Sequence, residues 1–230
     1  MDFGIRIFSE IQLTDNISFY LTETLAVTWI IVIALCAFAI VVGTKARKWN
    51  ATSKPSGLQN VVEFAVETFE NFFSSSSSIK VAYLAPWFFT LFVFLVFANT
   101  IGVIGMRPPT ADWGMTFPLA VSSLVLFQYA GIRHRPKNYI KGFFQPVFIF
   151  FPINLIGEIA KPIALSFRLF GNILGGVILL SLLYGMAPLL LRIGLPAVLH
   201  AYFDIASGIL QAFIFMVLSI TFVGLAAEDQ

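Results

Sequence analysis

Five long runs without a charged side chain are the feature that most constrains the fold of this 230-residue chain. Each run is near or above the roughly 20 residues that an α-helix needs to cross the hydrocarbon core of a bilayer. Charged residues make up only 11% of the chain, against about 25% in an ordinary soluble domain. The sequence therefore predicts an all-α membrane protein with about five membrane-embedded helices. The runs are Thr24 to Thr44, Val81 to Met106, Trp113 to Ile132, Leu169 to Leu191 and Ile205 to Ala227.

Charge and cysteine content exclude several classes of protein. The net charge is only +2 and the basic residues are scattered, so the chain lacks the contiguous basic face that binding to nucleic acid requires. The single cysteine, Cys36, excludes an internal disulfide framework and a cysteine-based zinc cluster. We expect no cofactor and no metal ion. Residues 1–230 are interpreted as a single integral membrane domain.

The distribution of lysine and arginine predicts the orientation. Basic clusters follow the first and the third run, and the positive-inside rule places such clusters in the cytoplasm. The N-terminus is then outside and the C-terminus cytoplasmic. Between Leu58 and Phe73, apolar residues recur at helical spacing with glutamates on another face, which predicts an amphipathic helix along the cytoplasmic interface.

The last third of the chain differs from ordinary spanning helices. The stretch from Pro152 to Pro188 would form a helix of about 54 Å, and Pro196 to Ala227 one of about 46 Å. A hydrocarbon core about 30 Å thick cannot hold either helix upright. Each helix must tilt steeply, break or lie partly along the membrane. We expect a strongly tilted hairpin of two long helices within about residues 146–228, with its turn near Leu189 and Leu190.

Arg168 lies about 16 residues from Pro152 and 20 from Pro188, in the middle of this apolar region. Its guanidinium stays protonated at physiological pH, and inserting such a charge at mid-membrane costs roughly 3 kcal/mol on translocon scales. An arginine in this place is a functional candidate. The alternative is a membrane anchor whose side chain reaches the interface.

Arg168 belongs to a stripe with alternating spacings of four and three, which falls on one face of a helix. Small residues on such a stripe allow another helix to approach closely, and the arginine calls for a partner that presents an acid. Close packing within the chain would explain the glycines equally well. The stripe consists of Gly157, Lys161, Ala164, Arg168, Gly171 and Gly175.

In the expected hairpin, residues at equal depth have numbers that add up to about 379, because both helices rise by the same amount per residue. We call this the hairpin relation. Arg168 is then level with Gln211. Asp204 lies on the outer side of the arginine and Glu158 on its cytoplasmic side. Carboxylates so placed can pass protons or coordinate small cations.

Asn172, Gln211 and His200 are candidates to extend this polar path. Each acid also has a simpler interpretation. Asp204 could lie near the interface and be solvated, and Glu158 could only form a salt bridge with Lys161 three residues away. His200 has the simpler reading of an interfacial residue.

Two stretches around these residues resemble a known family. The segment Pro162-Ile-Ala-Leu-Ser-Phe-Arg-Leu-Phe-Gly-Asn172 resembles the signature of the a subunits of F-type ATP synthases, in its bacterial or chloroplast form. The segment Gln211-Ala-Phe-Ile-Phe-Met-Val-Leu218 resembles the matching part of their last helix. Asn99 with Gly102, and Asn154 with Glu158, fit the same family.

The resemblance implies a subunit of the membrane Fo sector that is not catalytic by itself. Its partners would be the ring of c subunits, b-type stator subunits and the rest of the synthase complex, in a bacterial cell membrane. The stripe would face the ring. Arg168 would sit between two half-channels that couple H⁺ or Na⁺ flow to rotation and ATP synthesis.

One position departs from the family pattern. Many members carry a carboxylate or histidine nine residues after the arginine, where this chain has Val177. Asp204 occupies the position on the last helix where relatives carry histidine or glutamate. The hairpin relation puts positions 177 and 204 at nearly equal depth, so one carboxylate could serve where others use a pair.

Two other classes compete with this interpretation. A secondary transporter could use Arg168 to hold an anionic substrate, although the short chain and the absence of an inverted repeat weigh against it. A structural membrane scaffold has no need of a mid-membrane arginine flanked by two acids.

Overall fold

A computed structural model describes residues 7–14, 17–49, 55–77, 79–186 and 198–227. Within these residues, five helices are long and apolar enough to cross a membrane, which confirms the all-α membrane fold. They are Glu23–Ala46, Lys80–Ile104, Trp113–His134, Phe148–Met186 and Val198–Ala227.

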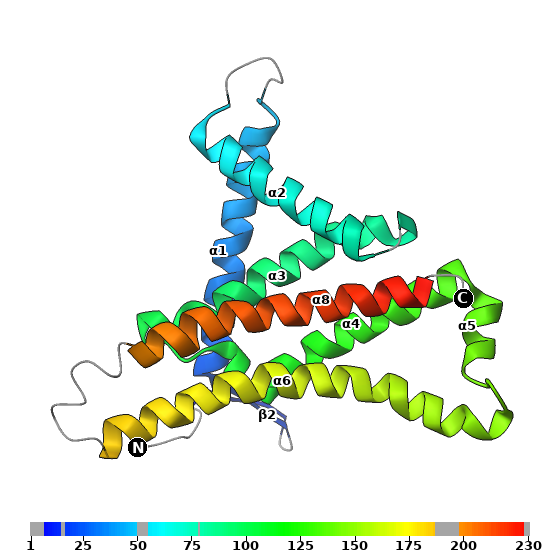
Figure 1. The fold of residues 1–230 in the computed structure, drawn as a ribbon. Coiled ribbons are helices and arrows are strands. Elements are labelled where there is room, and N and C mark those ends of the chain that lie inside the picture. The colour runs from blue at the N-terminus through cyan, green and yellow to red at the C-terminus, as the bar shows by residue number, and fades with distance from the viewer. Residues whose placement is uncertain (1–6, 15–16, 50–54, 78, 187–197, 228–230) are drawn as a thin grey trace. The chain divides into compact units, whose positions relative to one another are not determined.

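Figure 1 shows the helices and strands along the chain. Several of the spans begin or end in a short 3₁₀ or π turn. In order they are β1 (Ile7–Thr14), β2 (Ile17–Thr22), α1 (Glu23–Ala46), α2 (Gly57–Ser76), η1 (Ile79–Leu84), α3 (Ala85–Thr100), η2 (Ile101–Ile104), η3 (Pro109–Ala111), α4 (Trp113–His134), α5 (Pro136–Gly142), η4 (Phe148–Phe150), α6 (Phe151–Met186), η5 (Ala201–Ser207) and α8 (Gly208–Ala227).

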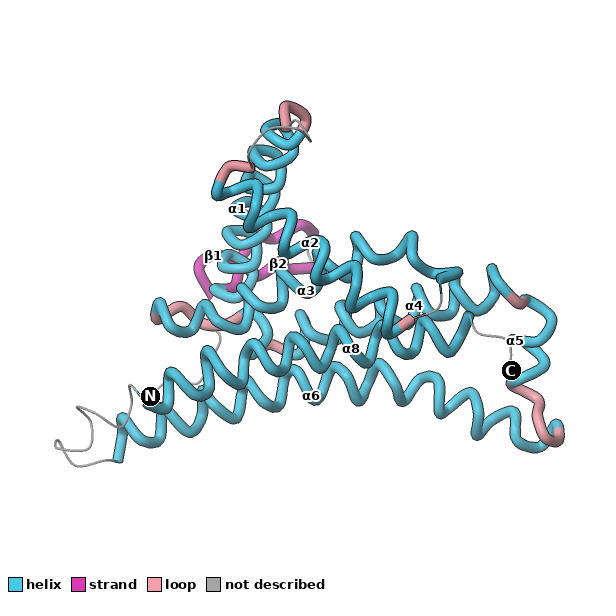
Figure 2. Tube along the Cα trace, turned by 45° about the horizontal axis from the view of Figure 1, so that its top comes forward, coloured by secondary structure: helices cyan, strands magenta, loops and turns pink. Residues whose placement is uncertain are grey.

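A short antiparallel hairpin precedes α1 and was not predicted. Strands β1 and β2, magenta in Figure 2, pair from Ile7 with Thr22 to Thr14 with Ile17. The sequence does carry the signal, since Ile17, Phe19 and Leu21 alternate with more polar residues, as in a strand.

Helix α2 confirms the predicted amphipathic helix. It begins after Ser56, whose hydroxyl accepts a hydrogen bond from the Gln59 amide, as is typical of an N-cap. Phe69 and Phe73 are buried and contact Phe89 and Phe88, with ring centroids 5.1 Å and 5.8 Å apart. Packing of these rings orients the apolar face of α2. Its place along the cytoplasmic interface stays a prediction.

The chain divides into two compact units, and each contains part of the candidate site. The first unit consists of residues 1–35, 94–116 and 167–212, and the second of 36–93, 117–166 and 213–230. The first has a small core around Val27, Ile31 and Ala98. The second has a larger core, in which Phe88, Phe127 and Ile220 are fully or almost fully buried. That the chain forms one membrane domain stays a prediction.

The two long helices near the C-terminus lie side by side in antiparallel orientation, as predicted (Figure 1). Helix α6 has 36 residues and runs without interruption through Pro162. In the first unit, Asn172 contacts Ser207, and Gly176 contacts Phe203. The residue numbers in each pair add up to 379, as the hairpin relation predicts. The predicted turn near Leu189 and Leu190 lies outside the described residues.

Candidate functional site

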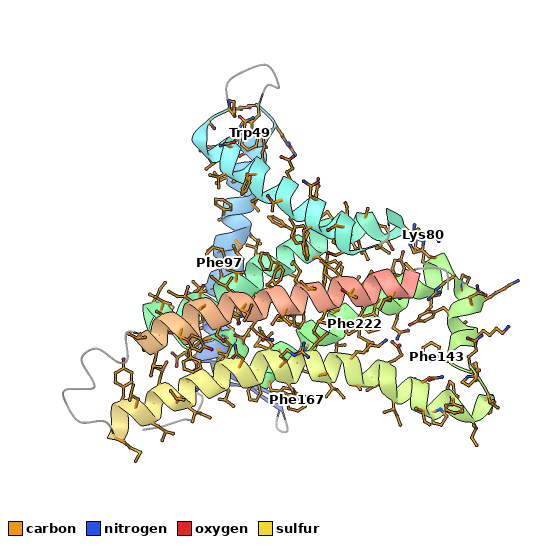
Figure 3. The ribbon with its side chains drawn as sticks, viewed as in Figure 1. Trp49, Lys80, Phe97, Phe143, Phe167 and Phe222 are labelled. Atoms are coloured by element: carbon orange, nitrogen blue, oxygen red, sulfur yellow. The ribbon has the colours of Figure 1, made fainter. Side chains whose placement is uncertain are left out.

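Arg168 lies on an exposed face of α6 in the first unit. Gly171 and Gly175 share this face, and a side-chain carbon built on either glycine would meet no atom within 4 Å. Phe167 beside the arginine (labelled in Figure 3) is 55% exposed. Its ring stacks on that of Trp113, with the ring centroids 5.9 Å apart. Among the described residues, no carboxylate forms an ion pair with Arg168. The guanidinium is therefore available to a partner.

The opposite face of this part of α6 packs within the unit. Leu169 is fully buried, and Ile173 is 5% exposed. Gly176 is buried because the Phe203 side chain occupies the space beside it, with Cβ only 3.1 Å from where a carbon on Gly176 would lie. The helix thus uses one glycine for close packing within the chain and leaves two others open.

In the second unit, Gly157 and Ala164 are also exposed, and Gly157 has open space beside it. Lys161 differs from them. Its ammonium lies 5.5 Å from the ring centroid of Phe127 on α4 and 5.4 Å from that of Phe222 on α8 (Figure 3). Both distances are within the range of a cation–π interaction. Lys161 is on the predicted stripe, but its charged end contacts rings of its own chain.

The first unit contains a relay of three polar side chains. Asp204 is 8% exposed, and its carboxylate lies 2.6 Å from Nδ1 of His200. Nε2 of the same imidazole lies 3.3 Å from the Tyr184 hydroxyl. An imidazole bonded at both nitrogens can take up a proton on one side and release it on the other. The His200 side chain is 36% exposed and that of Asp204 11%, so the relay runs from an accessible to a buried group.

Two further amides that the sequence suggests for the polar path, those of Asn172 and Gln211, belong to the first unit. The Asn172 amide donates to the Ser207 hydroxyl at 2.7 Å, and that hydroxyl lies 2.9 Å from the Asn172 carbonyl oxygen. Gln211 is 6% exposed, and its Nε2 atom has no hydrogen-bond partner among the described residues. A buried amide without a partner is costly, which makes Gln211 a group that a ligand or partner would satisfy. Its depth opposite Arg168 stays a prediction.

The second unit places Glu158 in a polar network. One carboxylate oxygen pairs with Lys161, and the other accepts from the Gln128 amide at 3.3 Å. The carbonyl oxygen of that amide accepts from the Tyr139 hydroxyl at 2.7 Å. Burial raises the pKa of Tyr139 to about 12, with a further contribution from Glu158. The hydroxyl therefore remains a donor at physiological pH.

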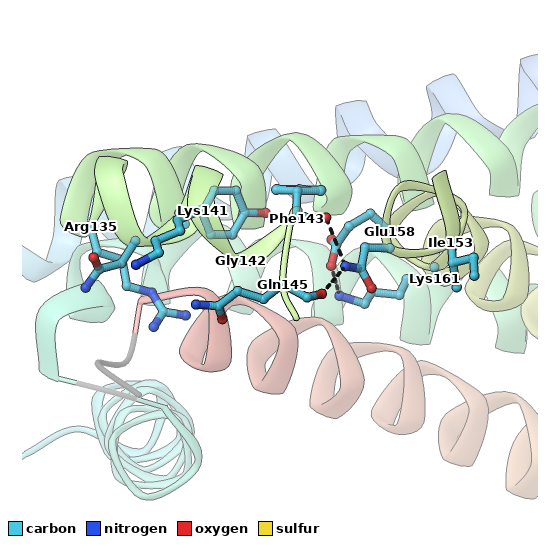
Figure 4. A pocket seen from close by; sticks show the side chains of 12 residues that line it. Arg135, Lys141, Gly142, Phe143, Gln145, Ile153, Glu158 and Lys161 are labelled. Carbon is cyan, nitrogen blue, oxygen red and sulfur yellow. Dashed lines mark hydrogen bonds and ion pairs between the residues drawn. The ribbon is translucent and has the colours of Figure 1, made fainter. Parts of the chain in front are cut away.

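Glu158 borders a cavity of about 690 Å³ that lies entirely within the second unit (Figure 4). Tyr139 of α5 also lines it, as do the basic side chains of Arg135, Lys141 and Lys161. Arg135 binds the end of α8, donating to the carbonyls of Leu225 and Ala226 at 3.0 Å. The cavity is large enough to hold several water molecules, so it can connect Glu158 to the surface of the unit.

Several of these polar partners were missed from the sequence. The hairpin relation could have found Ser207, because its number and that of Asn172 add up to 379. It does not pair Tyr184 with His200, whose numbers add up to 384. Nothing in the sequence pattern pairs Gln128 of α4 with Tyr139 and Glu158, since this contact depends on how three helices pack.

Comparison with known proteins identifies the family. Residues 25–224 match the family described as the ATP synthase A chain. A subunit a of ATP synthase from Acidothermus cellulolyticus is 38% identical over an alignment of 215 residues, which covers 88% of this chain and 79% of that protein. One from Moorella thermoacetica is 37% identical over 203 residues, covering 87% and 88%. A sodium ion specific subunit a from Propionigenium modestum is 40% identical over 151 residues, covering 58% and 51%. The chain therefore belongs to the ATP synthase A chain family.

Proposed function

We propose that this chain is the ion-conducting stator subunit of the Fo sector and that Arg168 faces the carboxylates of a rotating ring of c subunits. The observation that carries this proposal is an exposed arginine in a membrane-spanning helix with no carboxylate partner among the described residues. A charge at that depth is costly in lipid. A partner's carboxylate would compensate it, and the open glycines beside it would admit the partner's helix.

The outer access path runs through Tyr184, His200 and Asp204 in this proposal. Asp204 is the exchanging group, because it is the buried acid at the end of the relay. The inner path runs from Glu158 into the cavity beside Tyr139. The residues of the outer path belong to the first compact unit and those of the inner path to the second.

Arg168 couples the two paths. A ring carboxylate that arrives opposite the guanidinium is favoured in its charged, ion-free form, because an opposite charge nearby stabilises the carboxylate. It must release its ion there. If the two paths reach the ring on opposite sides of Arg168, an ion crosses the membrane only by travelling with the ring for almost a full turn.

The orientation and the remaining partners belong to the same proposal. Basic residues after the first and third spans favour an N-terminus outside and a C-terminus in the cytoplasm of a bacterial cell. The b-type subunits would hold the chain against rotation. The coupling ion is H⁺ or Na⁺, because a relative named sodium ion specific is about as similar as relatives named without an ion.

Copurification tests the proposal against a secondary transporter that would hold an anion with Arg168. The tagged chain is purified in mild detergent, and the complex is weighed by native mass spectrometry. We expect several copies of a small, apolar subunit with a membrane carboxylate for each copy of this chain. A chain that purifies alone and binds an anionic substrate would overturn the proposal.

A further inference from the structure

We infer that Asn99 is a positioning residue for Asp204, because it holds the π-helical turn from which that carboxylate projects. The consequence for ion transport rests on the proposed role of Asp204 in the outer path. The inference about geometry stands independently of that role.

The turn in question is η5, which spans Ala201–Ser207 and leads directly into α8 at Gly208. A π turn contains one residue more than an α turn and occurs often at functional sites. It is less stable than an α turn, so other groups must hold it in place. Asp204 lies within this turn.

Asn99 supplies such a group from α3. Its amide nitrogen donates to the carbonyl of Gly208 at 2.8 Å, where the π turn gives way to α8. Its amide oxygen accepts from the Thr110 hydroxyl at 2.7 Å. This second bond fixes which end of the amide faces Gly208. Asn99 is fully buried and Thr110 is 1% exposed, so water cannot replace either partner.

Two close contacts fix the turn further. A side-chain carbon on Gly208 would lie 3.1 Å from Cβ and 3.3 Å from the carbonyl oxygen of Asn99. A side-chain carbon on Gly102 would lie 3.0 Å from the carboxyl carbon of Asp204. Both glycines therefore permit an approach that a larger residue would prevent. The carboxylate is held between the backbone at Gly102 and the imidazole of His200.

Loss of the bond from Asn99 would allow the turn to convert to α-helix. With α8 fixed, removing the extra residue of the π turn would rotate the preceding residues by about 100° around the helix axis. Asp204 would then leave Gly102, and Phe203 would leave Gly176. The proximity of position 203 to position 176 therefore reports the geometry of the turn, and it can be measured without an assay of ion transport.

Disulfide formation tests the inference in the assembled synthase in membrane vesicles. Cys36 is changed to serine, and Gly176→Cys is combined with Phe203→Cys. A Cβ atom added at Gly176 would lie 3.1 Å from Cβ of Phe203, close to the separation of about 3.5–4.5 Å in disulfides. The yield after mild oxidation is compared with and without Asn99→Ala. Thr100→Ala is the control, because among the described residues the Thr100 hydroxyl donates only to the Val96 carbonyl in its own helix.

We expect a high yield of the disulfide in the parent and in Thr100→Ala. The yield should decrease at least about fivefold in Asn99→Ala, since the buried Gly208 carbonyl would lose the hydrogen bond from Asn99. Thr110→Val should lower the yield in the same direction, and it keeps the experiment decisive if Asn99→Ala fails to assemble. An unchanged yield in the variants that assemble would overturn the inference.

ATP synthesis in otherwise parental vesicles separates this inference from the proposed function. We expect Asn99→Ala to slow synthesis and to add no further loss to Asp204→Asn. Normal synthesis in Asp204→Asn together with a lost cross-link in Asn99→Ala would reject the role of Asp204 and leave the positioning intact. Slow synthesis in Asn99→Ala with a retained cross-link would reject the positioning.

Discussion

The pair formed by Lys161 and Glu158 yields a quantitative prediction about the inner path. The side chains are 33% and 21% exposed, so the pair is neither fully solvated nor fully buried. An exposed pair contributes about 0–1 kcal/mol, and breaking a buried pair costs about 3–5 kcal/mol. An intermediate value of about 2 kcal/mol corresponds to roughly a 30-fold change in rate when all of it is added to the barrier of the rate-limiting step.

We therefore expect Lys161→Met to slow ATP synthesis by about 10- to 30-fold, because it leaves the Glu158 carboxylate without its counter-charge. Glu158→Gln should also slow synthesis, since it removes the exchanging group of the inner path. The double variant should be no slower than Glu158→Gln alone. In that background the lysine has no carboxylate on which to act.

The assay is ATP synthesis driven by an imposed ion gradient in proteoliposomes, normalised to the amount of assembled complex. Lys137→Met is the matched control, because it removes an exposed charge on neighbouring α5 without touching the cavity. If the double variant shows the product of the two single effects, Lys161 acts independently of Glu158. That result would refute the reasoning and favour a lysine that contacts the ring directly.

Three further variants test the remaining parts of the site. Gly171→Leu should lower synthesis at least about tenfold by obstructing the ring. Ile159→Phe should not, because this exposed position of α6 lies about 120° around the helix from Gly171; equal effects would count against the open face. Asp204→Asn should slow synthesis about 100-fold or more with assembly intact, and a normal rate would remove Asp204 from the mechanism. Adding Val177→Glu to Asp204→His should partly restore the rate of synthesis that Asp204→His loses. Tyr139→Phe should slow synthesis by about fivefold, because one hydrogen bond is lost. The effect should be equal from about pH 6 to 9, since the pKa of Tyr139 is raised to about 12 and its ionisation affects the stability of the protein only above the ordinary value near 10. An effect that varies across that pH range would contradict the hydrogen-bond explanation.

The spans and the hairpin register were predictable because they follow from repeating geometry. Charge-free length locates a spanning helix, and two antiparallel helices with equal rise keep a constant sum of opposing residue numbers. Asn172 with Ser207 obeys that sum. The exposed position of Arg168 fits the predicted stripe, because helical spacing alone determines which residues share a face.

Other features could not be predicted from spacing. Lys161 shares the stripe, but its flexible stem carries the ammonium to rings on two other helices. The π turn around Asp204 depends on a bond from Asn99 across more than 100 positions of the chain. Tyr139 enters the inner site because Gly131 leaves room for its ring, which would approach within 2.5 Å of a side-chain carbon at that position. Such contacts arise from tertiary packing.

Arg168 offers the most direct test of the account, through ATP synthesis and passive ion leak measured in the same vesicles. Arg168→Lys should impair synthesis, because lysine can lose its proton when desolvated and lacks the planar fork of the guanidinium. Arg168→Ala should abolish synthesis and increase the leak, since ring carboxylates could then pass between the two paths with their ion still bound. An alanine variant that makes ATP at the parental rate without a leak would contradict the account.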